Sequence, residues 1–148
     1  MGVRQLSFDI YKVDENATKE AVEKYLLQVR EYKITEYIPV QPTVTAVISD
    51  MPRSFTGLTS DQTGGIVTKN IDELNRRKAH IERAEKAINR LPQKQQHLIR
   101  TRYFDSCEDI WDYQAAEEIG YSERHYRRIK TLAIYRLASM LGLLVFVE

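Results

Sequence analysis

One stretch near the C-terminal end, residues 111–136, constrains the fold of this chain most. It holds a small residue, Ala116, and a glycine four positions later, Gly120. A small side chain lets two helices cross closely, and glycine readily adopts the left-handed backbone that reverses a chain. Ser122 follows, and its hydroxyl can accept a hydrogen bond from a first-turn backbone N–H. We therefore predict a helix, a tight turn and a second helix, which together form a helix-turn-helix over 111–137.

The second helix of this motif is predicted to be amphipathic and basic. An apolar stripe at helical spacing is expected to face inward; it comprises Tyr126, Ile129, Leu132, Ala133 and Leu137. The opposite side is rich in bases, and residues 122–136 carry a net charge of about +4. Such a helix suits the phosphates of double-stranded DNA. We expect it to contact the major groove through Ser122, Glu123, Arg124, His125, Arg127, Arg128, Lys130 and Thr131.

Three arginines are the strongest candidates for reading bases. Arginine can hydrogen-bond bidentately to the edge of guanine, and the first turns of a recognition helix enter the major groove. Arg124, Arg127 and Arg128 lie in those first turns. The alternative is a solvated basic helix on an ordinary bundle, but a basic face alone does not explain the spacing of Ala116, Gly120 and Ser122.

The first helix of the motif is acidic. Phosphate would repel its carboxylates, which include Asp112, Glu117 and Glu118. One interpretation is a contact with a basic patch on a protein partner; the other is an ordinary solvated helix face, which is the usual role of a charge run.

Composition limits the class of protein. The 148 residues are 43% hydrophobic, which suits one compact domain or a small domain with an appendage. The net charge is only +1, so any DNA binding must come from a local patch. Cys107 is the sole cysteine, which excludes an internal disulfide and fits a reducing cytoplasm. The chain has no apolar run of about 18 residues and no leader pattern, so we expect it in the cytoplasm and not in a membrane.

Three regions are predicted along the chain. Residues 1–33 are expected to form an arm and an amphipathic helix over 17–32, with Asn16 or Thr18 as its cap. Residues 34–69 contain many Pro, Gly, Ser and Thr residues and predict a linker, part of it (37–48) able to form a strand. Residues 70–148 are expected to be a helical DNA-binding domain that folds without the first 69, with all the apolar partners of its motif after Asn70.

Within that domain, two helices are predicted before the motif. Asn70 with Glu73 has the spacing of a capping box, and apolar residues then recur to Leu91. Pro92 should end this helix and start another over 93–103.

The second of these helices and the chain end complete the expected bundle. The helix should bury Leu98, Ile99 and either Tyr103 or Phe104, and a loop should follow over 105–109. The last eight residues, 141–148, are unusually apolar and must fold back or meet a partner.

Two resemblances extend this interpretation. Leu91-Pro92, Arg102-Tyr103, Gly120-Tyr121-Ser122 and the run Arg127-Arg128-Ile129-Lys130 resemble region four of bacterial sigma factors over about residues 91–142. The whole chain is more similar to phage transcriptional regulators of the ArpU and RinA type, through TKEAVEKYLLQVREYK, AINRLPQ and SERHYRRIKTLAIYRLASMLG. This resemblance implies a protein of the bacterial host cytoplasm that activates late phage genes by binding upstream of their operon. The resemblance to sigma factors would allow the acidic helix to contact host RNA polymerase.

Other functions fit the residues less well. An enzyme is not expected, because His80, His97 and His125 are far apart in sequence and no cofactor or metal motif accompanies them. A phage DNA-packaging subunit of the small-terminase kind remains the main alternative, with the helix ending at Leu91 as an assembly stalk. RNA is a less suitable partner, because the basic face lacks interleaved aromatics for base stacking. A regulator could be a monomer or a homodimer, whereas a packaging ring predicts a large oligomer.

Overall fold

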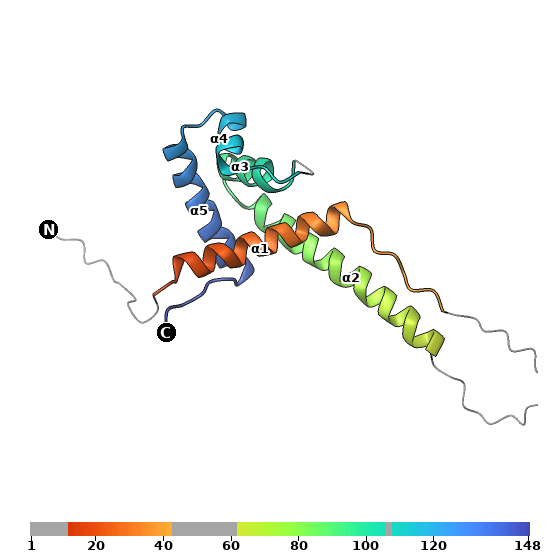
Figure 1. Cartoon of the computed structure of the whole chain (residues 1–148). Coiled ribbons are helices and arrows are strands. Elements are labelled where there is room, and N and C mark those ends of the chain that lie inside the picture. Colours follow the sequence, from red (N-terminus) through yellow and green to blue (C-terminus); the bar gives the residue numbers. More distant parts are fainter. Residues whose placement is uncertain (1–11, 43–61, 106–107) are drawn as a thin grey trace, which may run out of the picture.

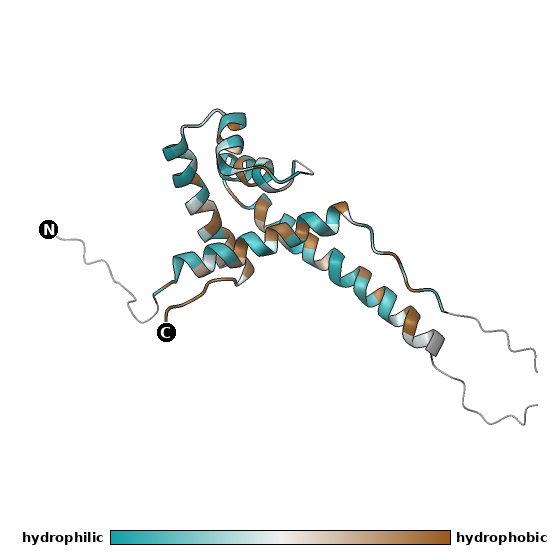
Figure 2. Ribbon diagram, viewed as in Figure 1, coloured by the Kyte–Doolittle hydropathy of each residue, from teal (hydrophilic) through white to brown (hydrophobic). Residues whose placement is uncertain are grey.

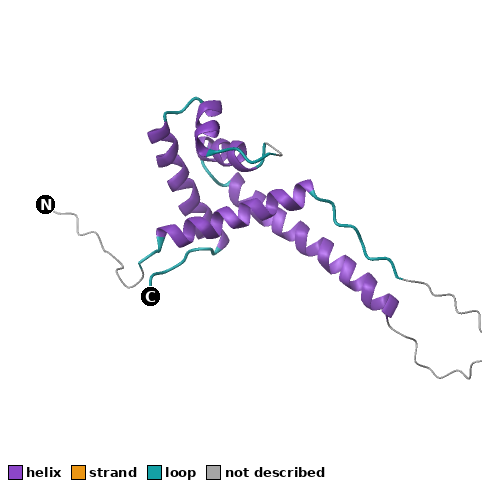
Figure 3. Cartoon of the chain, in the orientation of Figure 1, coloured by secondary structure: helices purple, strands orange, loops and turns teal. Residues whose placement is uncertain are grey.

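The chain is mainly helical. The structure, a computed structural model, describes residues 12–42, 62–105 and 108–148. These ranges contain the helices α1 (Glu15–Ile34), α2 (Gln62–Asn89), α3 (Gln93–Tyr103), α4 (Asp112–Ile119) and α5 (Glu123–Leu141). Figure 3 shows helices joined by loops and no strand in this part of the chain. The mainly α fold expected from the sequence is therefore confirmed.

Helix α1 belongs to the same core as the C-terminal helices. Its buried Val22 and Leu26 form one cluster with Leu98 of α3 and Leu137 of α5. In Figure 2 the apolar parts of α1 lie where it crosses the other helices. The expectation that the motif's apolar partners all follow Asn70 is therefore wrong, because an amphipathic helix covers the bundle from the N-terminal side.

Asp14, rather than Asn16 or Thr18, caps α1. The Asp14 side chain accepts a hydrogen bond from the N–H of Ala17 at 3.0 Å. Thr18 is buried instead, and its hydroxyl accepts a hydrogen bond from the N–H of Val145 at 3.0 Å. The helix therefore begins two residues earlier than the predicted residue 17.

Helix α2 is longer than predicted and starts within the expected linker. Figure 1 shows its N-terminal half extending away from the other helices. Asn70 lies inside this helix, so the predicted capping box is wrong. The Asn70 amide instead accepts from the N–H of Val40 at 3.0 Å and donates to the Val40 carbonyl at 2.9 Å. Glu73 pairs with Arg76 and Arg77.

The structure describes only part of the remaining predicted linker. Residues 36–42 have no regular structure, and residues 43–48 of the proposed strand, like Cys107, lie outside the described residues. The linker boundary at residue 69 is wrong because helix continues back to Gln62 despite Gly64 and Gly65.

Helix α3 matches its predicted bounds. Pro92 precedes its first residue, and Leu98, Ile99 and Tyr103 are buried. Phe104 ends the helix and is partly buried against the core. The proline break and the inward face were therefore both predicted correctly.

The apolar chain end folds back on the start of α1. Val13 and Phe146 form an antiparallel bridge, and the N–H of Val147 donates to the Lys12 carbonyl at 2.7 Å. The N–H of Asp14 donates to the Val145 carbonyl at 2.7 Å. Of the two outcomes expected for this segment, folding back is the one observed. None of the described helices is long and apolar enough to cross a membrane.

Candidate nucleic-acid interface

Helices α4 and α5 are joined by the tight turn that the sequence predicts. Gly120 ends α4 with φ 83°, in the left-handed region, and its N–H donates to the Ala116 carbonyl at 3.0 Å. Ala116 itself is buried where the helices meet. Ser122 then caps α5, accepting from the N–H of His125 at 3.3 Å. Ala116, Gly120 and Ser122 therefore act as the small buried residue, the turn glycine and the helix cap that the sequence predicts.

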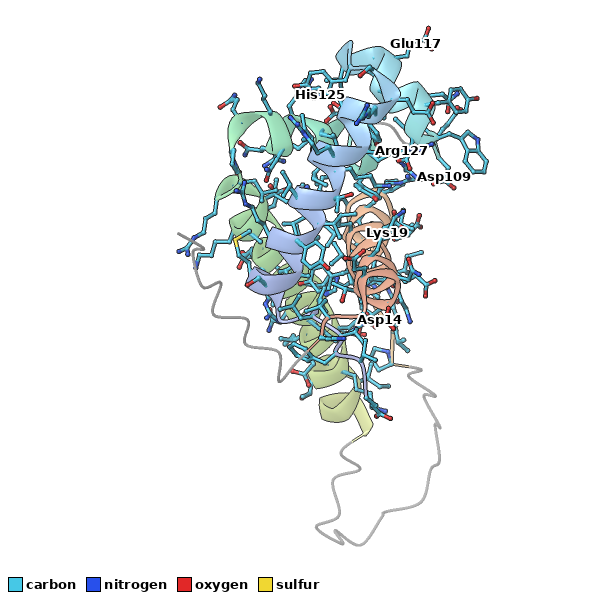
Figure 4. All side chains as sticks on the ribbon, turned by 90° about the vertical axis from the view of Figure 1, so that its left-hand side faces the viewer. Asp14, Lys19, Asp109, Glu117, His125 and Arg127 are labelled. Carbon is cyan, nitrogen blue, oxygen red and sulfur yellow. The ribbon has the colours of Figure 1, made fainter. Side chains whose placement is uncertain are left out.

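The first half of α5 presents cations to solvent. Arg124, Arg127 and Arg128 are exposed, as are Ser122, Glu123 and Thr131. Figure 4 looks onto this helix and labels Arg127 and His125 on it. We call Arg124, Arg127, Arg128 and Thr131 the basic face of α5.

The three arginines of this face differ in their surroundings. Arg127 forms an ion pair with Glu123 one turn earlier. Arg124 and Arg128 have no ion-pair partner among the residues that the structure describes. Ser122, Arg124, His125 and Arg128 line a shallow depression at the start of α5. Arg124 and Arg128 are thus the cations most available to an anionic partner.

His125 and Thr131 are partly committed to local contacts. The His125 ring is half-buried and meets the Tyr121 ring edge-on, with centroids 4.7 Å apart. The Thr131 hydroxyl donates to the Arg127 carbonyl at 2.8 Å. These contacts order the surface around Arg124 and Arg128.

Lys130 is not on this face. It is 5% exposed, and its ammonium donates to Asp112 at 2.9 Å and to Glu23 at 3.1 Å. Its predicted outward position is wrong because α1 packs against that side of α5. Leu132, predicted to face inward, is instead 48% exposed. The packing of α1 thus rotates the buried side of α5 relative to the stripe expected from α5 alone.

Asp112 is the centre of a polar network beneath the basic face. It accepts from Lys130, from Arg102 at 2.9 Å and from the hydroxyl of Tyr126 at 2.9 Å. Burial alone would raise the pKa of Asp112, but the hydrogen bonds and charges of Lys130 and Arg102 outweigh it and lower this pKa to about 2. The pKa of Tyr126 is raised by burial and by the Asp112 charge. The expectation of a freely projecting Asp112 is therefore wrong.

The remaining acids of α4 are exposed. Glu117 and Glu118 face solvent, and Glu117 lies at the far end of α4 in Figure 4. Two aromatic side chains near the start of α4 were missed by the sequence analysis: Trp111 is 68% exposed and Tyr113 is 63% exposed. Exposed aromatic side chains of this size are unusual on a monomer surface. The one sequence feature that could have revealed them is their position next to the acids of α4.

The histidines lie apart, as the sequence indicated. His80 stacks on Tyr25 with ring centroids 3.9 Å apart, and burial lowers its pKa. His97 is exposed on α3. Within the described ranges, no group of three or more His, Cys, Asp or Glu side chains could hold a metal ion.

Comparison with known proteins identifies a phage-related relative. An uncharacterized phage-related protein of Listeria innocua serovar 6a is 27% identical over 138 residues, which cover 93% of this chain and 96% of that protein. The similarity therefore extends over nearly the whole of both chains and supports a phage-associated protein. No family model matches the chain, and no solved structure is similar to it.

Proposed function

We propose that this protein is a sequence-specific, double-stranded DNA-binding regulator of phage transcription. The observation that carries the proposal is the pair Arg124 and Arg128, exposed and without ion-pair partners in the first turns of a helix held by a tight turn. Helices placed in this way insert their first turns into the major groove. The similarity to a phage-related protein supplies the biological setting.

Base reading would fall to Arg124 and Arg128. Each guanidinium can donate two hydrogen bonds to guanine O6 and N7, a contact worth about 1–3 kcal/mol of discrimination. Arg127 is held by Glu123, so a phosphate contact for it would require exchange of that partner. The buried Lys130 has a structural role in this proposal. It links α5 to α4 through Asp112 and to α1 through Glu23, and these links hold the basic face in a fixed orientation.

The acidic and aromatic surface of α4 fits a protein partner. Glu117 and Glu118 would be repelled by phosphate, whereas Trp111 and Tyr113 are side chains that dominate protein interfaces. With the resemblance to region four of sigma factors and to regulators of the ArpU and RinA type, this surface supports an activator of late phage genes that contacts host RNA polymerase. Asp112 is already held by Lys130 and Arg102, so we assign the polymerase contact to Glu117 and Glu118.

The direct test is selection of bound fragments from a phage genome with the full chain. We expect the enriched fragments to share one site upstream of an operon, and Arg124→Gln or Arg128→Gln to weaken binding to it at fixed salt. The doubly substituted Lys19→Gln, Lys24→Gln protein, altered on the exposed side of α1, is the control. Unchanged affinity of the combined Arg124→Gln, Arg128→Gln protein would contradict the assignment.

A DNA-packaging subunit is the second candidate. One observation favours it: Val67, Ile71 and Leu74 are exposed along the projecting half of α2, at spacing that suits helix association. A packaging ring predicts a large oligomer in solution, whereas a regulator predicts a monomer or dimer. Mass measurement by light scattering separates the two.

A further inference from the structure

Helix α5 lies between two grooves that differ in charge. The groove shared with α1 is lined by both signs, including Glu15, Lys19 and Arg127. The groove shared with α2 is lined by Ala87 and Met140 together with three cations. We call these cations, Arg83, Lys86 and Arg90, the α2 basic row. No acid lines this second groove, so the two flanks of α5 offer different surroundings to a polyanion.

The α2 basic row is exposed and largely available. Its members are spaced at i, i+3 and i+7, which places them on one side of the helix. Arg83 donates to the Leu141 carbonyl at 2.8 Å and so attaches the row to the end of α5. Lys86 and Arg90 have no ion-pair partner within the described part of the chain. Two cations therefore remain for an external anion.

The i, i+4 line of α5 that starts at Arg124 and Arg128 leads toward this row. Arg136 is exposed on the last turns of α5, and Met140, one turn further, lines the α2 groove. Arg124 and Met140 are sixteen residues apart, or about 24 Å along an α-helix. That separation exceeds the roughly 12 Å width of the major groove. If α5 enters the groove end-on through the first turns that carry Arg124, the α2 basic row would lie outside the groove, at the level of the sugar-phosphate backbone.

We propose that the α2 basic row is a second DNA-contact surface, which binds backbone phosphates flanking the bases read by α5. This inference rests on the proposed DNA-binding function. The surface would add affinity that does not depend on sequence, because its cations meet phosphates and not base edges. The composition of residues 70–91 did not reveal it, because acids and bases alternate along this segment and only the fold separates them.

The test compares two charge-matched variants of the full chain on a random-sequence duplex of about 30 base pairs, roughly three helical turns. Lys86→Gln, Arg90→Gln removes the two available cations of the row. Lys19→Gln, Lys24→Gln removes two exposed cations of α1. Affinity is measured over a range of salt concentrations. We expect the first variant to bind every duplex more weakly, with the slope of log K against log salt reduced by about 0.9 per lost contact, or about 1.8 in all. The second variant should keep the wild-type slope.

Failure of the inference and failure of the proposed function give different results. If Lys86→Gln, Arg90→Gln keeps the wild-type slope while Arg124→Gln, Arg128→Gln reduces it, the α2 basic row does not contact DNA and the role of α5 stands. Equal loss in the α1 control would also overturn the inference, because bulk charge would then explain the effect. If the wild-type protein binds no duplex even at low salt, the proposed function fails as well. Circular dichroism verifies that each variant is folded.

Discussion

The cations of α5 fall into two classes according to their surroundings. Arg128 is exposed and has no ion-pair partner among the described residues, whereas Lys130, two positions later, is buried between two carboxylates. Substitution should therefore affect different properties at the two positions. Charge alone does not separate them, since both residues are basic and both lie in the first half of the same helix.

Lys130→Met should destabilise the protein. The change removes the donor that Glu23 and Asp112 share, and the loss of hydrogen bonds between charged groups costs about 1.5–3 kcal/mol. Urea unfolding measures the loss. Arg128→Met is the matched control, and it should unfold like the wild type while losing affinity for DNA. A Lys130→Met protein of wild-type stability would show that the network adds nothing to the folded state.

Asp112 should make stability depend on pH in the acid range. Its pKa is about 2 in the folded protein, whereas an ordinary aspartate has a pKa of 3.8, so the unfolded chain binds the proton first as pH falls. Its contribution is complete above about pH 4 and is lost as the pH approaches 2. Asp112→Asn should remove this part of the dependence and lower stability at pH 7. Parallel pH profiles of the two proteins, from thermal unfolding, would argue against the depressed pKa.

At the scale of helices, the sequence predicted best those features that local chemistry determines. Pro92 marked the start of α3, and Gly120 with Ser122 marked the turn before α5. The start of α2 was missed because glycine and threonine in residues 63–68 favour a linker, whereas the structure continues the helix through them. The burial of Lys130 could not be predicted, because it depends on α1, more than 100 residues earlier in the chain. The basic face lies on one helix and was predicted. The α2 basic row was not predicted, because it too depends on how separate helices pack.

Gly120→Ala should destabilise the turn between α4 and α5. Its φ of 83° is strained for any residue with a Cβ, by about 1–2 kcal/mol. No atom lies within 4 Å of the added methyl group, so the cost comes from the backbone alone. Gly65→Ala is the opposite control: this glycine lies in α2 with open space around it, and the change should stabilise the helix by about 0.5–1 kcal/mol. Thermal unfolding distinguishes the two, and equal shifts would refute the role of the turn.

At the scale of the whole molecule, the described helices form one unit rather than an N-terminal appendage and a separate domain. Helix α1 contributes Val22 and Leu26 to the common core and Glu23 to the network around Lys130. The helices that carry the basic face are therefore incomplete without residues far from them in sequence.

A fragment of residues 62–148 should not fold stably by itself. Without α1 the fragment exposes the apolar surface that Val22 and Leu26 cover and leaves Lys130 without Glu23. Circular dichroism should show reduced helix content and no cooperative thermal transition. Addition of a peptide spanning residues 12–42 should restore part of the helical signal. A cooperative transition at the wild-type temperature in the fragment alone would show that α1 is dispensable.

The pairing of Val13 with Phe146 sets an order for events during synthesis. Residue 13 leaves the ribosome early, whereas its partner Phe146 is translated more than 100 residues later. Thr18 is buried in the folded protein, and its hydroxyl likewise has no Val145 N–H to accept from until residue 145 has been translated. The start of α1 therefore lacks these contacts on the nascent chain until residues 145–147 have been made. Any product that stops before this segment leaves the start of the helix without these partners, so such products should be the preferred substrates of cellular proteases.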